Sequence, residues 1–272
     1  MISYAQVQRI AAQADVSAEI IEKDYLIELI LFYISRDDYL KNVFVFRGGT
    51  ALKKMYFPDY RFSEDLDFLV AVRPLVVTTT GVPLGTATYP DPQSRGLVPH
   101  QIALREIEQK LEQLLNKVND DYPFKLTANT SVNSANTQSF IQYDIIPEIK
   151  ANKQLKVDIW KDDNIPGWQP RRILFTYQDF SQEPLRINVY NLESVVSDKI
   201  CRILGVDKEA RDIYDLWYLL NLDIDIVKVK AELKNKFGYD THLPNLLDKI
   251  NAPAYRINWQ NRLVHQIANL PD

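Results

Sequence analysis

The stretch FVFRGGTALKKMYFPDYRFSEDLDFL, residues 44–69, decides the fold of this chain. An apolar strand runs into a Gly-Gly-Thr turn, and a second predicted strand carries the aspartates Asp65 and Asp67. Because alternate residues of a strand project from the same face, these carboxylates lie side by side while Leu66 and Phe68 point into the core. Mg²⁺ in proteins is usually held by one or two carboxylates together with substrate phosphates. The stretch therefore predicts a site for a nucleotide and a metal.

The turn formed by Gly48, Gly49 and Thr50 supplies backbone N–H groups that no side chain obstructs, which leaves room for a triphosphate. A short helix is predicted directly after it, and Thr50 at the helix N-terminus offers a hydroxyl and an N–H to a phosphate oxygen. Such a triplet is more commonly a tight turn capped by its threonine. The paired aspartates favour the phosphate interpretation, and we expect Arg61 and Ser63, which precede them, to contact the nucleotide too.

The composition is that of an ordinary globular protein of 272 residues, 46% hydrophobic and 25% charged. A net charge of −4 argues against nucleic-acid binding through a general basic surface. Cys201 is the only cysteine, which excludes an intramolecular disulfide and a cysteine zinc cluster and fits a reducing, cytoplasmic setting. No secretion signal and no membrane span are expected. Without GxxxxGK[ST], GxGxxG, HExxH or GxSxG motifs, P-loop, Rossmann, zinc-hydrolase and serine-hydrolase chemistry lack support.

The hydrophobic pattern divides the chain into an α/β part, residues 1–190, and a helical part, residues 191–272. Two helices are predicted within residues 4–35, and strands at 43–47 and 65–70 flank the glycine turn. Further predicted elements are a long loop at 74–99, a helix at 100–119, and strands at 124–132, 138–146, 154–160 and 171–177, which most simply extend the same sheet. Helical periodicity then continues through segments 192–205, 210–221, 226–237, 243–250 and 256–269.

Asp158, in the segment LKVDIW, is a candidate third carboxylate. It alternates with Val157 and Ile159 on a later strand, so its side chain is expected to face away from the core. In that position it would complete a two-metal site with the first pair, or accept the proton of an attacking hydroxyl. The competing interpretation is an ordinary exposed aspartate of a strand.

Lys199 and Asp212 belong to two successive predicted helices of the C-terminal part. As site residues, Lys199 would neutralise triphosphate charge and Asp212 would position it or the nucleophile. Asp215, three residues later on the same helix face, competes with Asp212 for that role. The alternative is a structural ion pair between the helices, or a helix cap.

Five segments resemble, in the same order, the motifs of polymerase-β-type nucleotidyltransferases: FRGGTALKKMYF, RFSEDLDF, LKVDI, SDKICRIL and ARDIYDLW. The similarity is closer to the AbiEii/AbiGii family, the toxins of type IV abortive-infection toxin–antitoxin systems, which includes the MenT toxins. It covers about residues 18–220, and RFSEDLDF after GGTAL is its specific part. The resemblance implies a mixed α/β nucleotidyltransferase sheet with N-terminal helices and a C-terminal helical bundle.

In that family the glycine-Ser/Thr motif and the D-x-D pair form the NTP and Mg²⁺ site, which corresponds here to Gly48, Gly49, Thr50, Asp65 and Asp67. The later catalytic lysine and aspartate of the family match Lys199 and Asp212. The third sheet carboxylate of the wider superfamily matches Asp158. The resemblance therefore implies transfer of NMP from an NTP to an acceptor hydroxyl, with Lys199 beside the leaving pyrophosphate.

By the same resemblance, the acceptor is the 3′ end of a tRNA, and a cognate antitoxin protein or an antitoxin-regulated operon neutralises the toxin. Two other activities stay open at this point. The chain could transfer NMP to a protein hydroxyl, or it could be a nucleotide- or partner-binding module that has lost turnover.

Overall fold

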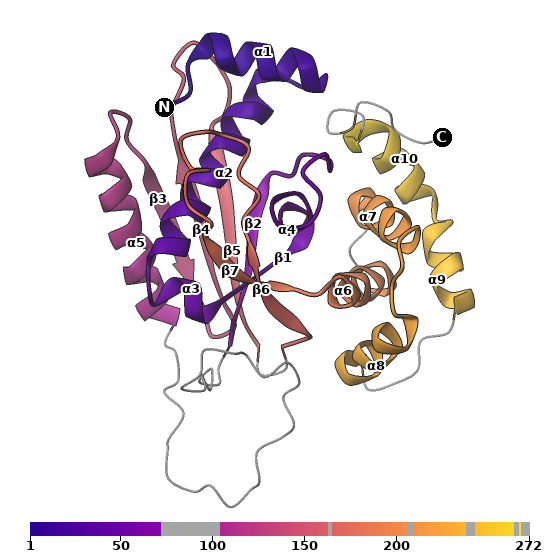
Figure 1. Cartoon of the computed structure of the whole chain (residues 1–272). Helices are drawn as coiled ribbons and strands as arrows, with labels where there is room; N and C mark the ends of the chain where they lie inside the picture. Colours follow the sequence, from indigo (N-terminus) through magenta and orange to yellow (C-terminus); the bar gives the residue numbers. More distant parts are fainter. Residues whose placement is uncertain (72–103, 163–164, 206–208, 238–242, 264–266, 268–272) are drawn as a thin grey trace, which may run out of the picture.

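A single seven-stranded sheet forms the centre of the protein, in the strand order β3-β4-β5-β2-β1-β7-β6. The computed structural model describes residues 1–71, 104–162, 165–205, 209–237, 243–263 and 267. Helices lie on both sides of this sheet, as Figure 1 shows. The mixed α/β architecture predicted from the sequence is confirmed.

The elements of the α/β part, in chain order, are α1 (Tyr4–Ala14), α2 (Ala18–Arg36), α3 (Leu40–Val43), β1 (Phe44–Arg47), α4 (Gly48–Met55), β2 (Asp65–Ala71), α5 (Leu104–Asp121), β3 (Thr127–Val132), β4 (Asn136–Gln142), β5 (Gln154–Asp162), β6 (Trp168–Arg172) and β7 (Arg186–Tyr190). The helices that follow are α6 (Leu192–Leu204), α7 (Ala210–Leu220), α8 (Ile226–Phe237), α9 (Leu243–Ile250) and α10 (Pro253–Arg262). The two predicted N-terminal helices and the strands around the glycine turn are confirmed. The loop predicted at 74–99 lies outside the described residues.

The strand predicted at 171–177 is wrong, because β6 ends at Arg172. Beyond it the backbone N–H groups of Thr176 and Tyr177 donate to the carboxylate of Glu28 on α2 instead of to a neighbouring strand. The apolar alternation of this segment reflects packing against α2. Strand β7, which pairs in parallel with β1 and antiparallel with β6, was not predicted.

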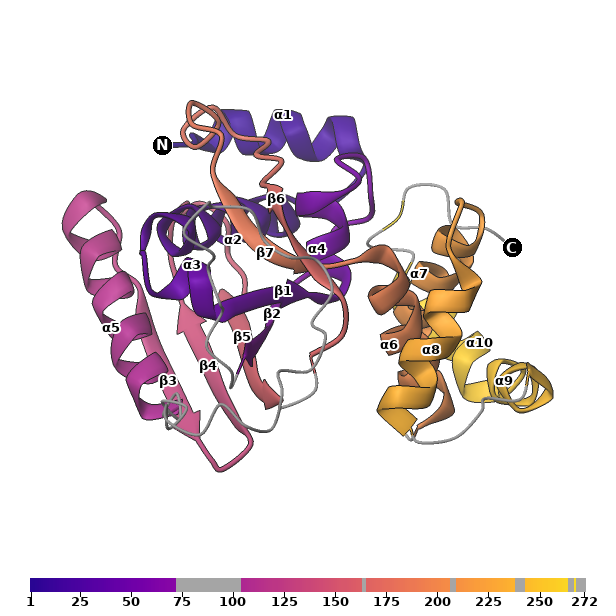
Figure 2. The same ribbon diagram turned by 60° about the horizontal axis from the view of Figure 1, so that its bottom comes forward.

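The two faces of β2 have different chemistry. Leu66 and Phe68 are fully buried in a core cluster that they share with α2. Leu69 projects from the other face and belongs to a second cluster with α6 and α7. Because Asp65 and Asp67 alternate with the core residues, they lie on the face directed toward α6 and α7. Figure 2 shows α6 to α10 grouped on that side, with α2, α3 and α5 on the opposite side.

The change from strands to helices occurs between Tyr190 and Leu192, where the sequence predicted it. The second core cluster nevertheless draws residues from both parts, including Val45 of β1 and Val196 of α6. The division into domains at residue 190 therefore stays a prediction. No helix within the described ranges combines the length and the apolar character that crossing a bilayer requires.

A buried ion cluster fixes α4 against α2. Lys54 of α4 donates to Asp24 Oδ2 at 2.8 Å and to Glu28 Oε1 at 2.7 Å. All three side chains are buried, so removing Lys54 would leave two carboxylates in the interior without this cation. Since α4 begins at Gly48, this cluster also fixes the position of the glycine turn.

Candidate active site

Arg47, Asp67 and Asp158 form one row across the adjacent strands β1, β2 and β5. Asp67 is the register partner of Arg47 on one side and of Asp158 on the other. Asp65 lies two residues earlier on β2, opposite Lys156. Residues paired in register project from the same face of a sheet. The sheet therefore brings the three predicted carboxylates together on one face, along with two cations.

The glycine turn packs directly against this row. Gly48 has a φ of +81°, and a Cβ there would lie 2.7 Å from Asp67 Oδ2. A Cβ on Gly49 would lie 2.6 Å from a guanidinium nitrogen of Arg61 and 3.3 Å from Ser63 Oγ. Both positions are thus too close to their neighbours for a side chain. The turn, the carboxylates and the two residues predicted to contact nucleotide are adjacent in space.

Thr50 makes a hydrogen bond within the protein, and its predicted contact with a nucleotide stays a prediction. Its hydroxyl donates to the backbone carbonyl of Asp65, which ties the start of α4 to the start of β2. The first N–H groups of a helix have no partner within the helix and carry its positive dipole end. The Thr50 hydroxyl proton is thus engaged with Asp65, while the N–H groups at the start of α4 are suited to a phosphate.

The ionised forms of the two β2 aspartates are disfavoured in the folded protein, because burial raises the pKa of both. Burial raises the pKa of Asp67, and the nearby Asp65 and Asp158 carboxylates raise it further, against the opposing effect of Arg47. Burial also raises the pKa of Asp65, which Arg211 and Lys156 oppose. Among the described residues, none makes a hydrogen bond or ion pair with the Asp67 carboxylate. A cation bound here would relieve that cost.

Asp65 and Asp67 are the carboxylates of this face that have no short ion pair with a described residue, and the metal role predicted for Asp158 stays a prediction. Asp158 is held by Gln138, which donates to its Oδ1 at 2.7 Å, and by Lys156, whose Nζ lies 2.6 Å from its Oδ2. Within the part of the chain that the structure describes, no three or more His, Cys, Asp or Glu side chains are arranged to hold a metal ion. A pair of carboxylates still fits Mg²⁺, which takes its remaining ligands from phosphates and water.

Lys199 lies between the two competing aspartates of α7. Its Nζ is 2.7 Å from Asp212 Oδ1 and 2.6 Å from Asp215 Oδ2. Burial disfavours the ammonium, but the two aspartates outweigh it and raise the pKa of Lys199. The inter-helix ion pair considered as an alternative is therefore present in the structure, joining α6 to α7.

Arg61 contacts Asp215 rather than pointing freely into the site. Its Nε and a terminal nitrogen lie 2.7 and 2.9 Å from the two Asp215 oxygens, and Tyr60 donates to the same carboxylate at 2.7 Å. Burial opposes ionisation of Asp215, yet Arg61 and Lys199 hold its pKa well below the usual range. Asp212 has fewer such contacts, with Lys199 and with Arg202 Nε at 2.8 Å.

Sequence reasoning missed two arginines of the site. Arg47 precedes the glycine turn directly, and Arg211 opens α7 with NH1 3.7 Å from Asp65 Oδ2. Both lie next to residues that the sequence had singled out, and that adjacency was the available signal. Only the packing of α7 over β2 shows that Arg211 reaches the carboxylate pair.

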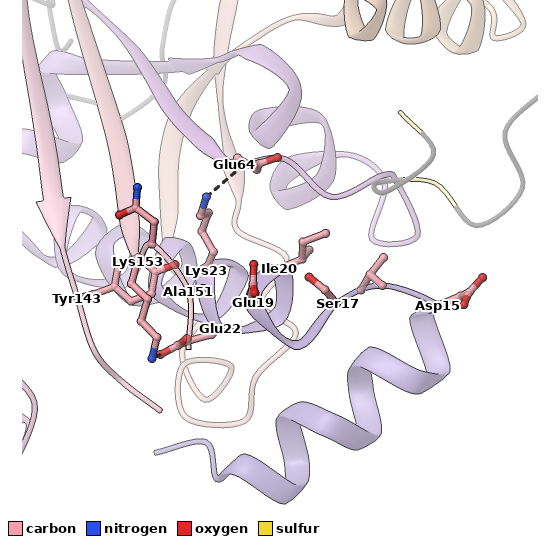
Figure 3. A pocket seen from close by; sticks show the side chains of 12 residues that line it. Asp15, Ser17, Glu19, Ile20, Glu22, Lys23, Glu64, Tyr143, Ala151 and Lys153 are labelled. Atoms are coloured by element: carbon pink, nitrogen blue, oxygen red, sulfur yellow. Dashed lines mark hydrogen bonds and ion pairs between the residues drawn. The ribbon is translucent and has the colours of Figure 1, made fainter. Parts of the chain in front are cut away.

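A pocket of about 530 Å³ lies between the start of α2, Glu64 and the segment before β5 (Figure 3). Glu64 directly precedes Asp65 in the chain. Glu22, Glu64, Lys23 and Lys153 line it, and Lys23 forms a 3.2 Å ion pair with Glu64. None of the predicted site residues lines this pocket, and its lining includes further acidic side chains. Negative charge disfavours a polyphosphate, so this pocket is not suited to the triphosphate of an NTP.

A mixed sheet with two strand aspartates beside a glycine turn at a helix N-terminus is the arrangement that the resemblance to nucleotidyltransferases implied. The family described as "Nucleotidyl transferase AbiEii toxin, Type IV TA system" matches residues 30–272. The chain belongs to this family and is a nucleotidyltransferase toxin of a type IV toxin–antitoxin system. The resemblance seen in the sequence motifs is thereby confirmed.

Among solved structures, the chain is similar to MenT4, a nucleotidyltransferase toxin from Mycobacterium tuberculosis H37Rv. The two share 16% sequence identity with a TM-score of 0.60, over 93% of this chain and 78% of that chain. At this identity the likeness supports the fold. No protein with a curated description matches the sequence significantly.

Proposed function

We propose that the protein transfers NMP from an NTP to an acceptor hydroxyl, with Mg²⁺ bound by Asp65 and Asp67. The single observation that carries this proposal is the Asp67 carboxylate. It lies against the backbone of Gly48, its pKa is raised by burial, and no described residue neutralises it through a hydrogen bond or ion pair. A carboxylate in this state is a suitable ligand for a cation that arrives together with a nucleotide.

Each part of the site has a role in this proposal. The N-terminus of α4, with Gly48 and Gly49, holds phosphate oxygens through its N–H groups. Ser63, beside the turn, contacts the nucleotide. When bound, Mg²⁺ would neutralise charge on the phosphates during in-line attack. Asp158, in register beside Asp67, is proposed as the third carboxylate, which accepts the proton of the attacking hydroxyl.

The charged residues of α6 and α7 are proposed to act mainly by holding these helices in place over the carboxylate face. Lys199 and Asp212 hold the two helices together over the carboxylate face, and Arg61 ties the loop before β2 to Asp215 of α7. A catalytic site depends on such support, because small displacements of reacting groups are costly. We propose that Lys199 contributes to pyrophosphate release through this network, with Asp212 as the aspartate closest to the chemistry.

For the acceptor we propose the 3′ end of a tRNA, modified in the cytoplasm and spared when a cognate antitoxin is present. Family membership supports the toxin and its antitoxin, since the match covers residues 30–272. Arg47 and Arg211, whose ion pairs with the described residues are 3.7 Å or longer, support a polyanionic acceptor despite the net charge of −4. Transfer of NMP to a protein hydroxyl is the alternative that the test below distinguishes.

The test is to incubate the purified protein with Mg²⁺, each α-labelled NTP in turn, and total RNA or cell extract. The matched control carries Asp65→Ala and Asp67→Ala. Label entering tRNA-sized RNA with the parent alone would support the proposal and identify the preferred base. Label in a protein band would show that the acceptor is a protein hydroxyl and not tRNA. NTP binding without any labelled product would favour an inactive binding module.

A further inference from the structure

The cations on the carboxylate face and on the helices that cover it differ in how closely their charges are neutralised. Lys199, Arg61, Arg202 and Lys156 each have a nitrogen 2.6 to 2.8 Å from a carboxylate oxygen. With the residues that the structure describes, Arg47 and Arg211 form only long ion pairs. The nearest carboxylate oxygen to either is 3.7 Å away, on Asp198 for Arg47 and on Asp65 for Arg211.

These two arginines are placed one beside each β2 aspartate. Arg47 is the register partner of Asp67 on β1 and directly precedes the glycine turn. Its Nε is buried and has no hydrogen-bond partner. Arg211 approaches Asp65 from the first turn of α7, and its remaining ion pair, to Glu209, is 3.8 Å long. Both guanidinium groups thus flank the position where the proposed metal would sit.

We propose that Arg211 and Arg47 are the residues that bind the β- and γ-phosphates of the NTP and the pyrophosphate that leaves. This inference rests on the proposed function and assigns its triphosphate contacts. A guanidinium group binds two phosphate oxygens at once through its planar fork, which makes the hydrogen bonds short and charge-assisted. An arginine whose ion pairs are all long loses little electrostatic attraction to carboxylates when it turns to such a partner.

Lys199 is less suited to that contact in this structure. It would have to leave two carboxylates at 2.7 and 2.6 Å in a buried environment, and separating a buried ion pair is strongly unfavourable. Arg211 is more accessible, with 28% of its side chain exposed, and lies against Asp65 itself. The distances therefore favour the arginines over the lysine as triphosphate ligands.

The test compares binding of NTP, NDP and NMP by the parent, Arg211→Met, Arg211→Lys and Arg47→Met, with and without EDTA. Arg9→Met, an exposed arginine on α1, is the matched control. Isothermal titration calorimetry gives the affinities, and thermal melting verifies that each variant is folded. We expect Arg211→Met to weaken NTP binding about 10- to 100-fold and NMP binding little, as for loss of a hydrogen bond between charged groups.

The phosphate-number dependence separates direct contact from an effect through Asp65. If the arginine contacts the phosphates directly, the loss of affinity in the variant persists in EDTA and increases from NMP to NTP. If the substitution only alters metal binding at Asp65, the loss of affinity should vanish in EDTA. Parent-like preference for NTP in folded Arg211→Met and Arg47→Met proteins would overturn the inference while leaving the proposed function intact. A parent that neither binds nor transfers nucleotide would overturn both.

Discussion

Gly48 and Asp67 are so close that a Cβ at position 48 would lie 2.7 Å from Asp67 Oδ2. Gly48 also has a φ of +81°, a backbone conformation that side-chain-bearing residues rarely adopt. The backbone of the turn and the carboxylate therefore occupy adjoining space that admits no further carbon. The geometry of the site depends on this contact.

Gly48→Ala is expected to lower both stability and activity. The positive φ costs about 1–3 kcal/mol, and the clash displaces either the turn or the Asp67 side chain. We expect nucleotidyl transfer to fall at least about 10-fold, since misplacement of about 1 Å can cost more than that. Urea denaturation and the labelled-NTP assay measure the two effects. Gly205→Ala is the matched control, because its Cβ would lie 3.4 Å from the nearest atoms, and equal behaviour of the two variants would contradict the prediction.

Asp67→Asn is expected to abolish transfer but to stabilise the metal-free protein at neutral pH. Burial raises the folded-state pKa of Asp67 above that of the unfolded chain, about 3.9. At low pH both states are protonated, and as the pH rises the ionised carboxylate destabilises the folded parent alone. The variant should therefore melt at a higher temperature than the parent at pH 7 in EDTA, with the difference vanishing below about pH 3.9, where the carboxylate is protonated in both states.

Mg²⁺ provides the control for that measurement. With nucleotide present, it should raise the melting temperature of the parent more than that of Asp67→Asn, because only the parent keeps the full carboxylate pair. Transfer by the variant should fall at least about 100-fold, as for loss of a major electrostatic group in a catalytic site. A variant that melts below the parent throughout the pH series would show that Asp67 is stabilising as an anion.

Lys199→Met is expected to destabilise the fold by about 3 kcal/mol or more, because it leaves Asp212 and Asp215 buried with one fewer cation. Lys228→Met is the matched control. Its ion pair with Asp225 is 3.4 Å long and solvent-exposed, so the loss should stay below about 1 kcal/mol. Urea denaturation of the two variants measures the difference. A Lys199→Met protein as stable as the parent, yet inactive, would instead assign the lysine a direct role in the chemistry.

Asp215→Asn and Asp212→Asn are expected to distinguish the aspartate that stabilises the fold from the aspartate that takes part in nucleotidyl transfer. Asp215 accepts from Arg61, Tyr60 and Lys199, so its neutralisation should cost more stability than that of Asp212. Asp212→Asn should keep the fold and lose transfer. Thermal melting and the labelled-NTP assay together decide which aspartate has which role. A greater loss of stability in Asp212→Asn than in Asp215→Asn would exchange the two roles.

The local part of the site could be predicted from the sequence. The alternation around Asp65 and Asp67 determines which side chains enter the core, and the buried Leu66 and Phe68 confirm it. The Gly-Gly-Thr turn likewise begins a helix, as its sequence indicates. These predictions succeed because strand periodicity and glycine conformation depend on neighbouring residues. The strand predicted at 171–177 failed for the opposite reason, since Glu28 of α2 takes its backbone donors.

The sequence by itself determined the strand–turn–helix–strand unit, the carboxylate pair and the family motifs. Only the tertiary structure decided which charges neutralise one another. Arg61 pairs with Asp215, 154 residues further along the chain, and Arg211 reaches Asp65 from α7. Periodicity assigns each side chain to a face of its own element, but an ion pair requires two distant elements to be packed at a particular distance. That packing holds Lys199 between two aspartates and leaves Asp67 without a partner among the described residues.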